Sequence, residues 1–168
     1  MSNLIKSKVI RPLAENDAAA LVNFYNSLSP ASKRTFRPLG EKTTLEVCQR
    51  IVNENLSVPI NRYDLTCWHA SELVGWTFVT NLNDDCPEVG LAVADSWQGK
   101  KIGKNLLGLL LGWACDREIA KVCLIVVTDN LRAIHLYKNY NFVIYGEIFD
   151  QADQLSYFQM VANLISAA

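Results

Sequence analysis

Residues 98–104 read Gln-Gly-Lys-Lys-Ile-Gly-Lys and separate an apolar run, Val89 to Ala94, from a helical pattern, Ile102 to Ile119. This order predicts a strand that meets a helix through a short turn with two glycines and three lysines. Backbone N–H groups at a helix start have no intrahelical partner, and the helix dipole adds partial positive charge there. Glycine lets the backbone approach a ligand closely. The stretch therefore predicts an anion cradle, with a tight connection that binds nothing as the alternative.

The stretch does not match two common nucleotide-binding motifs. No Gly-Lys-Ser/Thr follows at the distance that a P-loop requires, and the Gly-x-Gly-x-x-Gly spacing of a dinucleotide site is missing. A second segment decides between cradle and plain turn. It follows the apolar run Val122 to Thr128 and reads Asn-Leu-Arg-Ala-Ile-His-Leu-Tyr-Lys-Asn-Tyr-Asn-Phe from Asn130 to Phe142.

Together the two segments resemble the GNAT superfamily of acetyl-CoA-dependent N-acetyltransferases. The family pattern is Gln/Arg-x-x-Gly-x-Gly/Ala after one strand and Asn-x-x-Ala-x-x-Leu-Tyr-x-x-x-Gly-Phe after the next. Seven positions match in order, namely Gln98, Gly103, Asn130, Ala133, Leu136, Tyr137 and Phe142. The resemblance is specific from Glu88 to Tyr145 and weaker from Val9 to Leu82. Two positions depart from the pattern: Lys101 replaces the central loop glycine, and Asn141, which tolerates the left-handed region, replaces the glycine before the aromatic residue.

The resemblance implies an α/β fold of the mixed α+β kind. Its central sheet is mixed, mostly antiparallel, built of about seven strands and splayed in the middle, with helices on both faces. The chain itself predicts the order βααβββαβαββ within one N-acetyltransferase domain over residues 1–168. The predicted strands are 8–13, 63–70, 73–81, 89–94, 122–128, 142–149 and 155–161, and the predicted helices are 15–26, 43–55, 102–119 and 130–140. Ser29-Pro30 predicts a helix start, and Thr43 with Glu46 predicts a capping box.

Composition excludes several classes of protein. The chain has 168 residues, enough for one domain with a proper core, and its 50% hydrophobic and 20% charged residues are typical of an ordinary soluble globular protein. The net charge of −1 gives no reason to expect binding to nucleic acid or to an anionic membrane. The longest apolar run, Leu106 to Cys115, is too short for a membrane span, and the N-terminus lacks a signal-peptide core. The five cysteines are scattered without a Cys-x-x-Cys pair, so we expect reduced, mostly buried thiols, no metal and a cytoplasmic protein.

The resemblance assigns the cofactor site to three parts of the chain. The turn is expected to surround the pyrophosphate of acetyl-CoA, and the strand is expected to offer main-chain groups to the pantetheine arm. A plain core strand and an ordinary N-cap are the alternatives for the strand and for Asn130. The expected cofactor-binding residues are Leu91, Ala92, Val93, Gln98, Gly99, Lys100, Lys101, Ile102, Gly103, Lys104, Asn130, Ala133 and Tyr137.

Tyr137 is the predicted catalytic acid. It follows Asn130 by seven residues, which is two helical turns, so both side chains face the same side. A tyrosine with a pKa near 10 can donate a proton to a departing thiolate of comparable basicity. A tyrosine that only fills the core is the alternative.

Glu88 is the candidate base. An alkyl amine has a pKa near 10.4 and is protonated at neutral pH, so some group or water chain must accept its proton. Glu88 opens the strand that leads to the acetyl site and resembles an acidic residue that some family members use, but it could equally be a solvated charge at a strand end. A second acidic position of the family is Ile125 here, which closes that route. His135 and His69 are weaker candidates, expected at the surface and at a hairpin end.

The resemblance implies that the acceptor is held largely by two segments, residues 29–40 and 147–155. The first carries Lys33, Arg34 and Arg37, and the second carries Glu147, Asp150 and Asp153. Acidic groups suit a cationic amine, whereas the basic stretch suits a carboxylate or phosphate, and either cluster is most often a solvated face.

The leading hypothesis is an N-acetyltransferase that moves the acetyl group of acetyl-CoA to a primary amine of a small molecule by direct attack in a ternary complex. Transfer to a protein N-terminus or lysine is the alternative within the class. A CoA-binding sensor without turnover is the alternative from another class. Assembly into a homodimer is left open.

Overall fold

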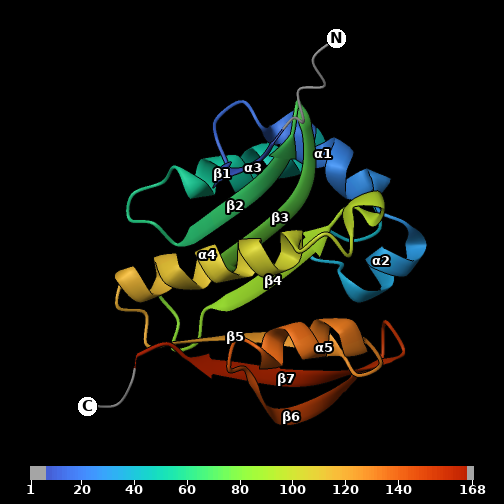
Figure 1. The fold of residues 1–168 in the computed structure, drawn as a ribbon, viewed down its shortest axis with the longest axis vertical. Helices are drawn as coiled ribbons and strands as arrows, with labels where there is room; N and C mark the ends of the chain where they lie inside the picture. Colours follow the sequence, from blue (N-terminus) through green and yellow to red (C-terminus); the bar gives the residue numbers. More distant parts are fainter. Residues whose placement is uncertain (1–6, 166–168) are drawn as a thin grey trace.

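The computed structural model describes residues 7–165 and contains one seven-stranded sheet with helices on both faces (Figure 1). The strands follow the order β1-β2-β3-β4-β5-β7-β6, and every neighbouring pair is antiparallel except β4 and β5. Their bounds are β1 Lys8–Pro12, β2 Arg62–His69, β3 Glu72–Thr80, β4 Glu88–Val93, β5 Lys121–Val127, β6 Val143–Asp150 and β7 Leu155–Asn163. This sheet confirms the predicted fold class.

Five α-helices connect the strands: α1 Ala18–Ser27, α2 Pro30–Thr35, α3 Leu45–Asn55, α4 Ile102–Asp116 and α5 Leu131–Lys138. The predicted start of α2 is confirmed, because the Ser29 hydroxyl accepts the Ser32 N–H at 3.2 Å and Pro30 takes the first helical position. The predicted cap of α3 is one residue off. Thr44 is the cap and accepts the Val47 N–H at 3.3 Å, whereas Thr43 is buried and its own N–H donates to the Asn26 side chain at 2.9 Å.

The four helices predicted with bounds are all shorter in the structure, and two of them differ by three residues at one end. Helix α1 begins at Ala18 rather than Glu15, because Asp17 closes a turn by accepting the Ala14 N–H at 2.8 Å. Helix α4 ends at Asp116 rather than Ile119, because Glu118 takes a positive φ of 58° that ends the helix.

The sheet separates two hydrophobic cores. Helices α4 and α5 pack on one face, where Leu106, Leu110, Val122 and Met160 are fully buried. Helices α1 and α3 pack on the other face around Trp76.

The five cysteines differ in burial. Cys48 and Cys67 are buried, Cys86 and Cys123 are half-buried, and Cys115 is exposed on α4, so the expectation of mostly buried thiols holds for two of the five.

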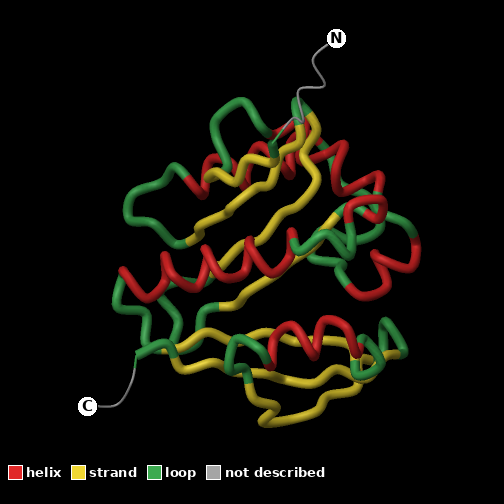
Figure 2. The backbone as a smooth tube through the Cα atoms, in the orientation of Figure 1, coloured by secondary structure: helices red, strands yellow, loops and turns green. Residues whose placement is uncertain are grey.

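The sheet opens between β4 and β5. The two strands are parallel and share a single bridge, Glu88 with Cys123, so they diverge after Glu88. Figures 1 and 2 show the resulting division into β1–β4 on one side and β5, β7 and β6 on the other, with α4 and α5 across the same face. The edge of β4 beyond Glu88 therefore faces this opening, as the predicted splay requires.

Candidate active site

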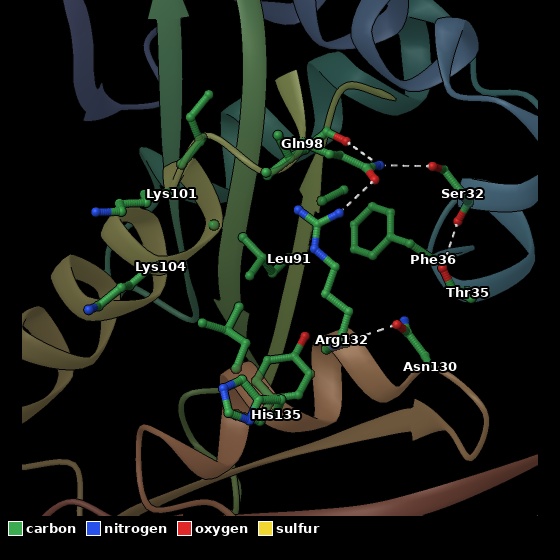
Figure 3. Close-up of a pocket in the computed structure, with 18 of the residues that line it drawn as sticks. Ser32, Thr35, Phe36, Leu91, Gln98, Lys101, Lys104, Asn130, Arg132 and His135 are labelled. Carbon is green, nitrogen blue, oxygen red and sulfur yellow. Dashed lines mark hydrogen bonds between the residues drawn. The ribbon is translucent and has the colours of Figure 1, made fainter. Parts of the chain in front are cut away.

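A pocket of about 580 Å³ lies between the start of α4, the edge of β4, helix α2 and helix α5 (Figure 3). It brings together twelve of the thirteen residues predicted to bind the cofactor: Leu91, Ala92, Val93, Gln98, Gly99, Lys101, Ile102, Gly103, Lys104, Asn130, Ala133 and Tyr137. The exception is Lys100, which does not line the pocket and whose ammonium lies 4.4 Å from the centre of the Trp97 ring.

The turn before α4 has the backbone of a glycine-rich cradle. Gly99 has a φ of 76°, and Lys101 adopts the left-handed conformation with φ 63° and ψ 8°. Lys101 is the N-cap of α4, and its side chain makes no capping hydrogen bond. The N–H groups of the first turn are therefore left for a ligand. A left-handed non-glycine residue costs about 1–2 kcal/mol, so Lys101 takes at some cost the conformation that glycine would take freely.

Gly103, in the first turn of α4, lies close to the side chains of β4. A Cβ built on Gly103 would lie 3.5 Å from the Leu91 side chain and 3.7 Å from Val93, which are ordinary packing distances. The protein itself therefore leaves room for alanine at this position. The glycine is explained better by the pocket that it lines.

Gln98 links the turn to its neighbours. Its amide nitrogen donates to the Val93 carbonyl at 3.1 Å and to the Ser32 hydroxyl at 3.2 Å, and its amide oxygen accepts from Arg132 at 3.3 Å (Figure 3). Ser32 in turn donates to Asp95 at 2.8 Å. The Gln98 side chain thus holds α2 and the turn together and is engaged by protein groups.

Helix α2 was not predicted to touch the cofactor pocket, yet it forms one wall of it. The helix has no buried residue and is held by polar contacts, of which three join Ser29 and Ser32 to Asp95 at 2.6–3.0 Å. Burial acts to raise the pKa of Asp95, but these hydrogen bonds lower it below its usual value.

The first pocket is also lined by residues that were not predicted to bind the cofactor. They are Ala31, Ser32, Thr35, Phe36, Asp95, Arg132, His135, Leu136 and Asn139.

Tyr137 is 7% exposed and packs its ring 5.6 Å from that of Phe142. Burial raises the pKa of Tyr137 to about 12, so the phenol stays protonated at neutral pH. Within residues 7–165 no protein group hydrogen-bonds its hydroxyl. Asn130 caps α5 by accepting the Ala133 N–H at 3.3 Å, which confirms the capping role considered for it. Asn141 follows α5 with a φ of 63°, as expected for a residue at a glycine position.

A second pocket of about 430 Å³ meets the first at Tyr137. Helix α4 lines only the first pocket, and strands β6 and β7 line only the second. Six residues line both, namely Thr35, Phe36, Leu91, Asn130, Ala133 and Tyr137. Glu88 is exposed and lines the second pocket, as does Ile125. The structure thus places Glu88 on one side of this junction and the cradle on the other.

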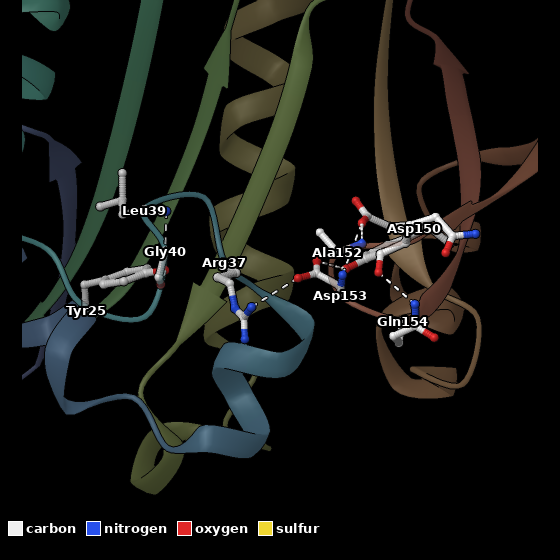
Figure 4. Close-up of polar contacts among 10 residues, drawn as sticks. Tyr25, Arg37, Leu39, Gly40, Asp150, Ala152, Asp153 and Gln154 are labelled. Atoms are coloured by element: carbon white, nitrogen blue, oxygen red, sulfur yellow. Dashed lines mark hydrogen bonds and ion pairs between the residues drawn. The ribbon is translucent and has the colours of Figure 1, made fainter.

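Two ion pairs start from the first of the two segments expected to hold the acceptor, and one of them reaches the second segment. Arg34 forms a bidentate pair with Asp129 at 2.8 and 2.9 Å, and this pairing lowers the pKa of Asp129. Arg37 reaches Asp153 at 3.1 Å (Figure 4). Asp153 also accepts the Tyr157 hydroxyl at 2.9 Å. The loop that carries Arg37 is fixed by Tyr25, whose hydroxyl donates to the Gly40 carbonyl at 2.6 Å.

Not every charge of these segments reaches the second pocket. Arg34, Arg37, Asp150 and Asp153 line it. Lys33 lies elsewhere, because its ammonium donates to the Asn26 carbonyl at 3.2 Å, and Glu147 does not line the pocket.

The two histidines differ from expectation in one respect. His69 packs against Trp97 at 4.6 Å, outside both pockets, as expected of a residue at a hairpin end. His135 is exposed, as expected, but it lines the first pocket.

The described residues contain no cluster of three His, Cys, Asp or Glu side chains that could hold a metal ion. Across residues 7–165, each helix is too short or too polar to cross a bilayer.

A family model described as "Acetyltransferase (GNAT) family" matches residues 22–142. Solved structures share the fold across nearly the whole chain. An acetyltransferase of the GNAT family from Streptococcus pneumoniae has a TM-score of 0.80 and 22% identity, and it covers 94% of this chain and 99% of its own. The yncA protein of Salmonella typhimurium, solved with acetyl-CoA, has a TM-score of 0.81 and 17% identity over 96% of both chains.

A third similar structure carries an amine as well as the cofactor. The spermidine N-acetyltransferase of Vibrio cholerae, in complex with CoA and spermine, has a TM-score of 0.77 and 18% identity, and it covers 94% of this chain and 95% of its own. No curated protein sequence matches the chain significantly. At these identities the solved structures establish the fold, and the family model establishes the family.

Proposed function

The chain belongs to the acetyltransferase (GNAT) family, and from this premise we propose that it transfers the acetyl group of acetyl-CoA to a primary amine of a small molecule. One observation carries the proposal: an anion cradle and a second pocket meet at Tyr137 and Leu91. A donor in the first pocket and an acceptor in the second would come into contact at this junction. Direct attack in a ternary complex requires such an arrangement.

The residues of the first pocket fit acetyl-CoA. The uncapped start of α4 and the left-handed Lys101 present backbone N–H groups suited to a pyrophosphate, with the ammonium groups of Lys101 and Lys104 on the same pocket. The edge of β4 from Leu91 to Val93 faces the opening in the sheet, where an extended pantetheine arm can pair with it as an added strand does. Acetyl-CoA supplies an activated thioester.

Tyr137 is suited to act as a proton donor. Its hydroxyl has no protein partner among residues 7–165, and the phenol is protonated at neutral pH, so its O–H is available to a ligand. A neutral phenol beside a departing thiolate stabilises the developing negative charge and can transfer its proton. Glu88 on the opposite side of the junction is suited to take the proton of the ammonium through water.

A small acceptor is supported by the size of the second pocket, about 430 Å³. The ion pair Arg37–Asp153 joins two residues that line it, whereas Arg34, which also lines it, is paired with Asp129 outside the lining. A spermidine N-acetyltransferase shares this fold, which supports a small amine as the acceptor.

Turnover with a panel of primary amines tests the proposal. Purified protein is mixed with acetyl-CoA and each amine, free thiol is measured, and the acetylated amine is identified by mass spectrometry. We expect thiol release that depends on the amine, with a mass increase of one acetyl group on the amine. Tight CoA binding without turnover on any amine or peptide N-terminus would instead support the CoA-binding sensor, and turnover restricted to peptides would support protein acetylation.

A further inference from the structure

The second pocket has aromatic side chains on both of its walls. Phe36 and Phe78 form one wall, with ring centres 6.3 Å apart. The Phe78 ring is fixed in place: a Cβ on Gly90 would lie 2.3 Å from it, so the ring rests on the β4 backbone, and the Arg62 guanidinium lies 4.5 Å from its centre. The Phe78 ring is therefore held in place before any ligand binds.

The opposite wall is built from the last three strands and carries two exposed side chains with apolar surface. Ile125 is 56% exposed and Tyr145 is 58% exposed, and both line the pocket. In the β5–β7 register Ile125 pairs with Gln159 and Val127 pairs with Tyr157, so Ile125, Gln159 and Tyr157 lie on one face of the sheet. A flat apolar group placed between the two walls would contact rings on both sides.

The charges of this pocket favour a cation. Both arginines that line it are already paired with aspartates, Arg34 with Asp129 and Arg37 with Asp153. Among the ion pairs of residues 7–165, none involves Glu88 or Asp150, which also line the pocket. An incoming ammonium therefore meets carboxylates without a cationic partner, whereas an incoming carboxylate has to compete with Asp129 or Asp153 for its arginine.

We propose that the acceptor is an arylalkylamine, meaning a primary amine joined by a short chain to an aromatic ring, with no carboxylate. This inference rests on the proposed function and adds the chemical class of its acceptor. The ring is bound between Phe36 and Phe78 on one wall and Tyr145 and Ile125 on the other. Aromatic pairs prefer offset or edge-to-face contacts, and the tilt of 48° between Phe36 and Phe78 presents rings in more than one orientation.

The substrate test compares amines that differ in the ring, in a carboxylate or in the number of positive charges. 2-Phenylethylamine is set against butylamine, which lacks the ring, against phenylalanine, which adds a carboxylate, and against spermidine, which adds charge but no ring. At saturating acetyl-CoA we expect kcat/KM for 2-phenylethylamine to exceed that of each comparison amine by about tenfold or more. A preference for spermidine, phenylalanine or butylamine overturns the inference but leaves the proposed function standing. Absence of turnover with every amine overturns both.

Two substitutions on one strand locate the ring. Tyr145→Ala removes a pocket aromatic, whereas Phe149→Ala removes an aromatic of the same strand that is 53% exposed and lies outside the pocket. Tyr145→Ala should raise KM for 2-phenylethylamine by about two- to tenfold, the range that one aromatic contact supplies. It should leave KM for butylamine and the affinity for CoA unchanged, and Phe149→Ala should change none of these. An equal effect of Tyr145→Ala on both amines, or no effect on either, overturns the assignment.

Discussion

Glu88 and Cys123 form the single backbone bridge between β4 and β5 in the described part of the chain. The Cys123 N–H donates to the Pro87 carbonyl at 2.9 Å, so the two strands are joined just where β4 begins. Beyond this point their backbones separate, and the outer edge of β4 has no strand beside it. The bridge therefore fixes where the opening between β4 and β5 starts. Glu88 lies at the closed end of this opening, and Leu91 and Tyr137 lie further along it.

Tyr137→Phe should lower kcat by about 10²–10⁴-fold, the usual cost of removing a general acid. The substitution keeps the ring that packs on Phe142, so the fold and the affinity for CoA should persist. Initial rates at saturating acetyl-CoA, measured beside a direct CoA titration, check both expectations. Rates equal to those of the parent would contradict the acid role, and a large loss of CoA affinity would indicate a binding role.

The pH dependence of the same residue is a separate prediction. Burial raises the pKa of Tyr137 to about 12. A proton donor is competent while protonated, so its contribution is complete below that pKa and is lost only as pH rises through it. We therefore expect no alkaline fall in kcat near pH 10, where a tyrosine of ordinary pKa would titrate. A falling limb centred near pH 10 that disappears in Tyr137→Phe would contradict the raised pKa.

Glu88→Gln should lower kcat/KM at neutral pH by up to about 10²-fold and recover part of it at high pH. The glutamine keeps the shape but cannot accept a proton, whereas at high pH the amine, with a pKa near 10.4, loses its proton unaided. Profiles of kcat/KM against pH for the parent and the variant are the measurement. If the two profiles coincide, Glu88 is a solvated charge at a strand end.

Local patterns in the sequence predicted most of the fold. The alternation of apolar runs and turns predicted the order of the elements along the chain, whereas the splayed sheet was expected from the family resemblance. The positive φ of Lys101 and Asn141 agrees with the glycine positions that they occupy in the family pattern. The contribution of α2 could not be predicted in this way. Ser32 reaches the turn through Asp95 and Gln98, which are 63 and 66 residues away, and no periodicity reports a side-chain contact over such a separation.

The caps show a second limit of the same kind. Thr43 and Thr44 are adjacent and chemically alike, so the local pattern allowed either to cap α3. Burial of Thr43 and its contact with Asn26, 17 residues earlier, decide for Thr44.

Asp64→Ala should destabilise the protein by about 3–5 kcal/mol, because it leaves a buried charge without its partner. Asp64 is fully buried and accepts from Arg62 at 2.7 and 3.0 Å, from the Trp76 ring nitrogen at 2.6 Å and from Asn55. Urea unfolding at neutral pH measures the change. Arg34→Ala is the control, since its ion pair with Asp129 is exposed and its midpoint should stay near that of the parent. Equal midpoints for the two variants would contradict the structural role of Asp64.

Gly103→Ala separates ligand binding from stability within α4. A Cβ at this position meets only ordinary contacts, the closest at 3.5 Å, and alanine favours helix over glycine by about 0.5–1 kcal/mol. The variant should therefore be as stable as the parent or slightly more so. If the backbone of residues 102–104 must approach a pyrophosphate, the added methyl group should weaken CoA binding by about tenfold or more, because it occupies the pocket that Gly103 lines.

Gly112→Ala is the matched control on the same helix, where a Cβ has no neighbour within 4 Å. It should gain similar stability and keep full CoA affinity. Thermal unfolding and a CoA titration on both variants decide the matter, and unchanged affinity in Gly103→Ala would place the phosphates away from this turn.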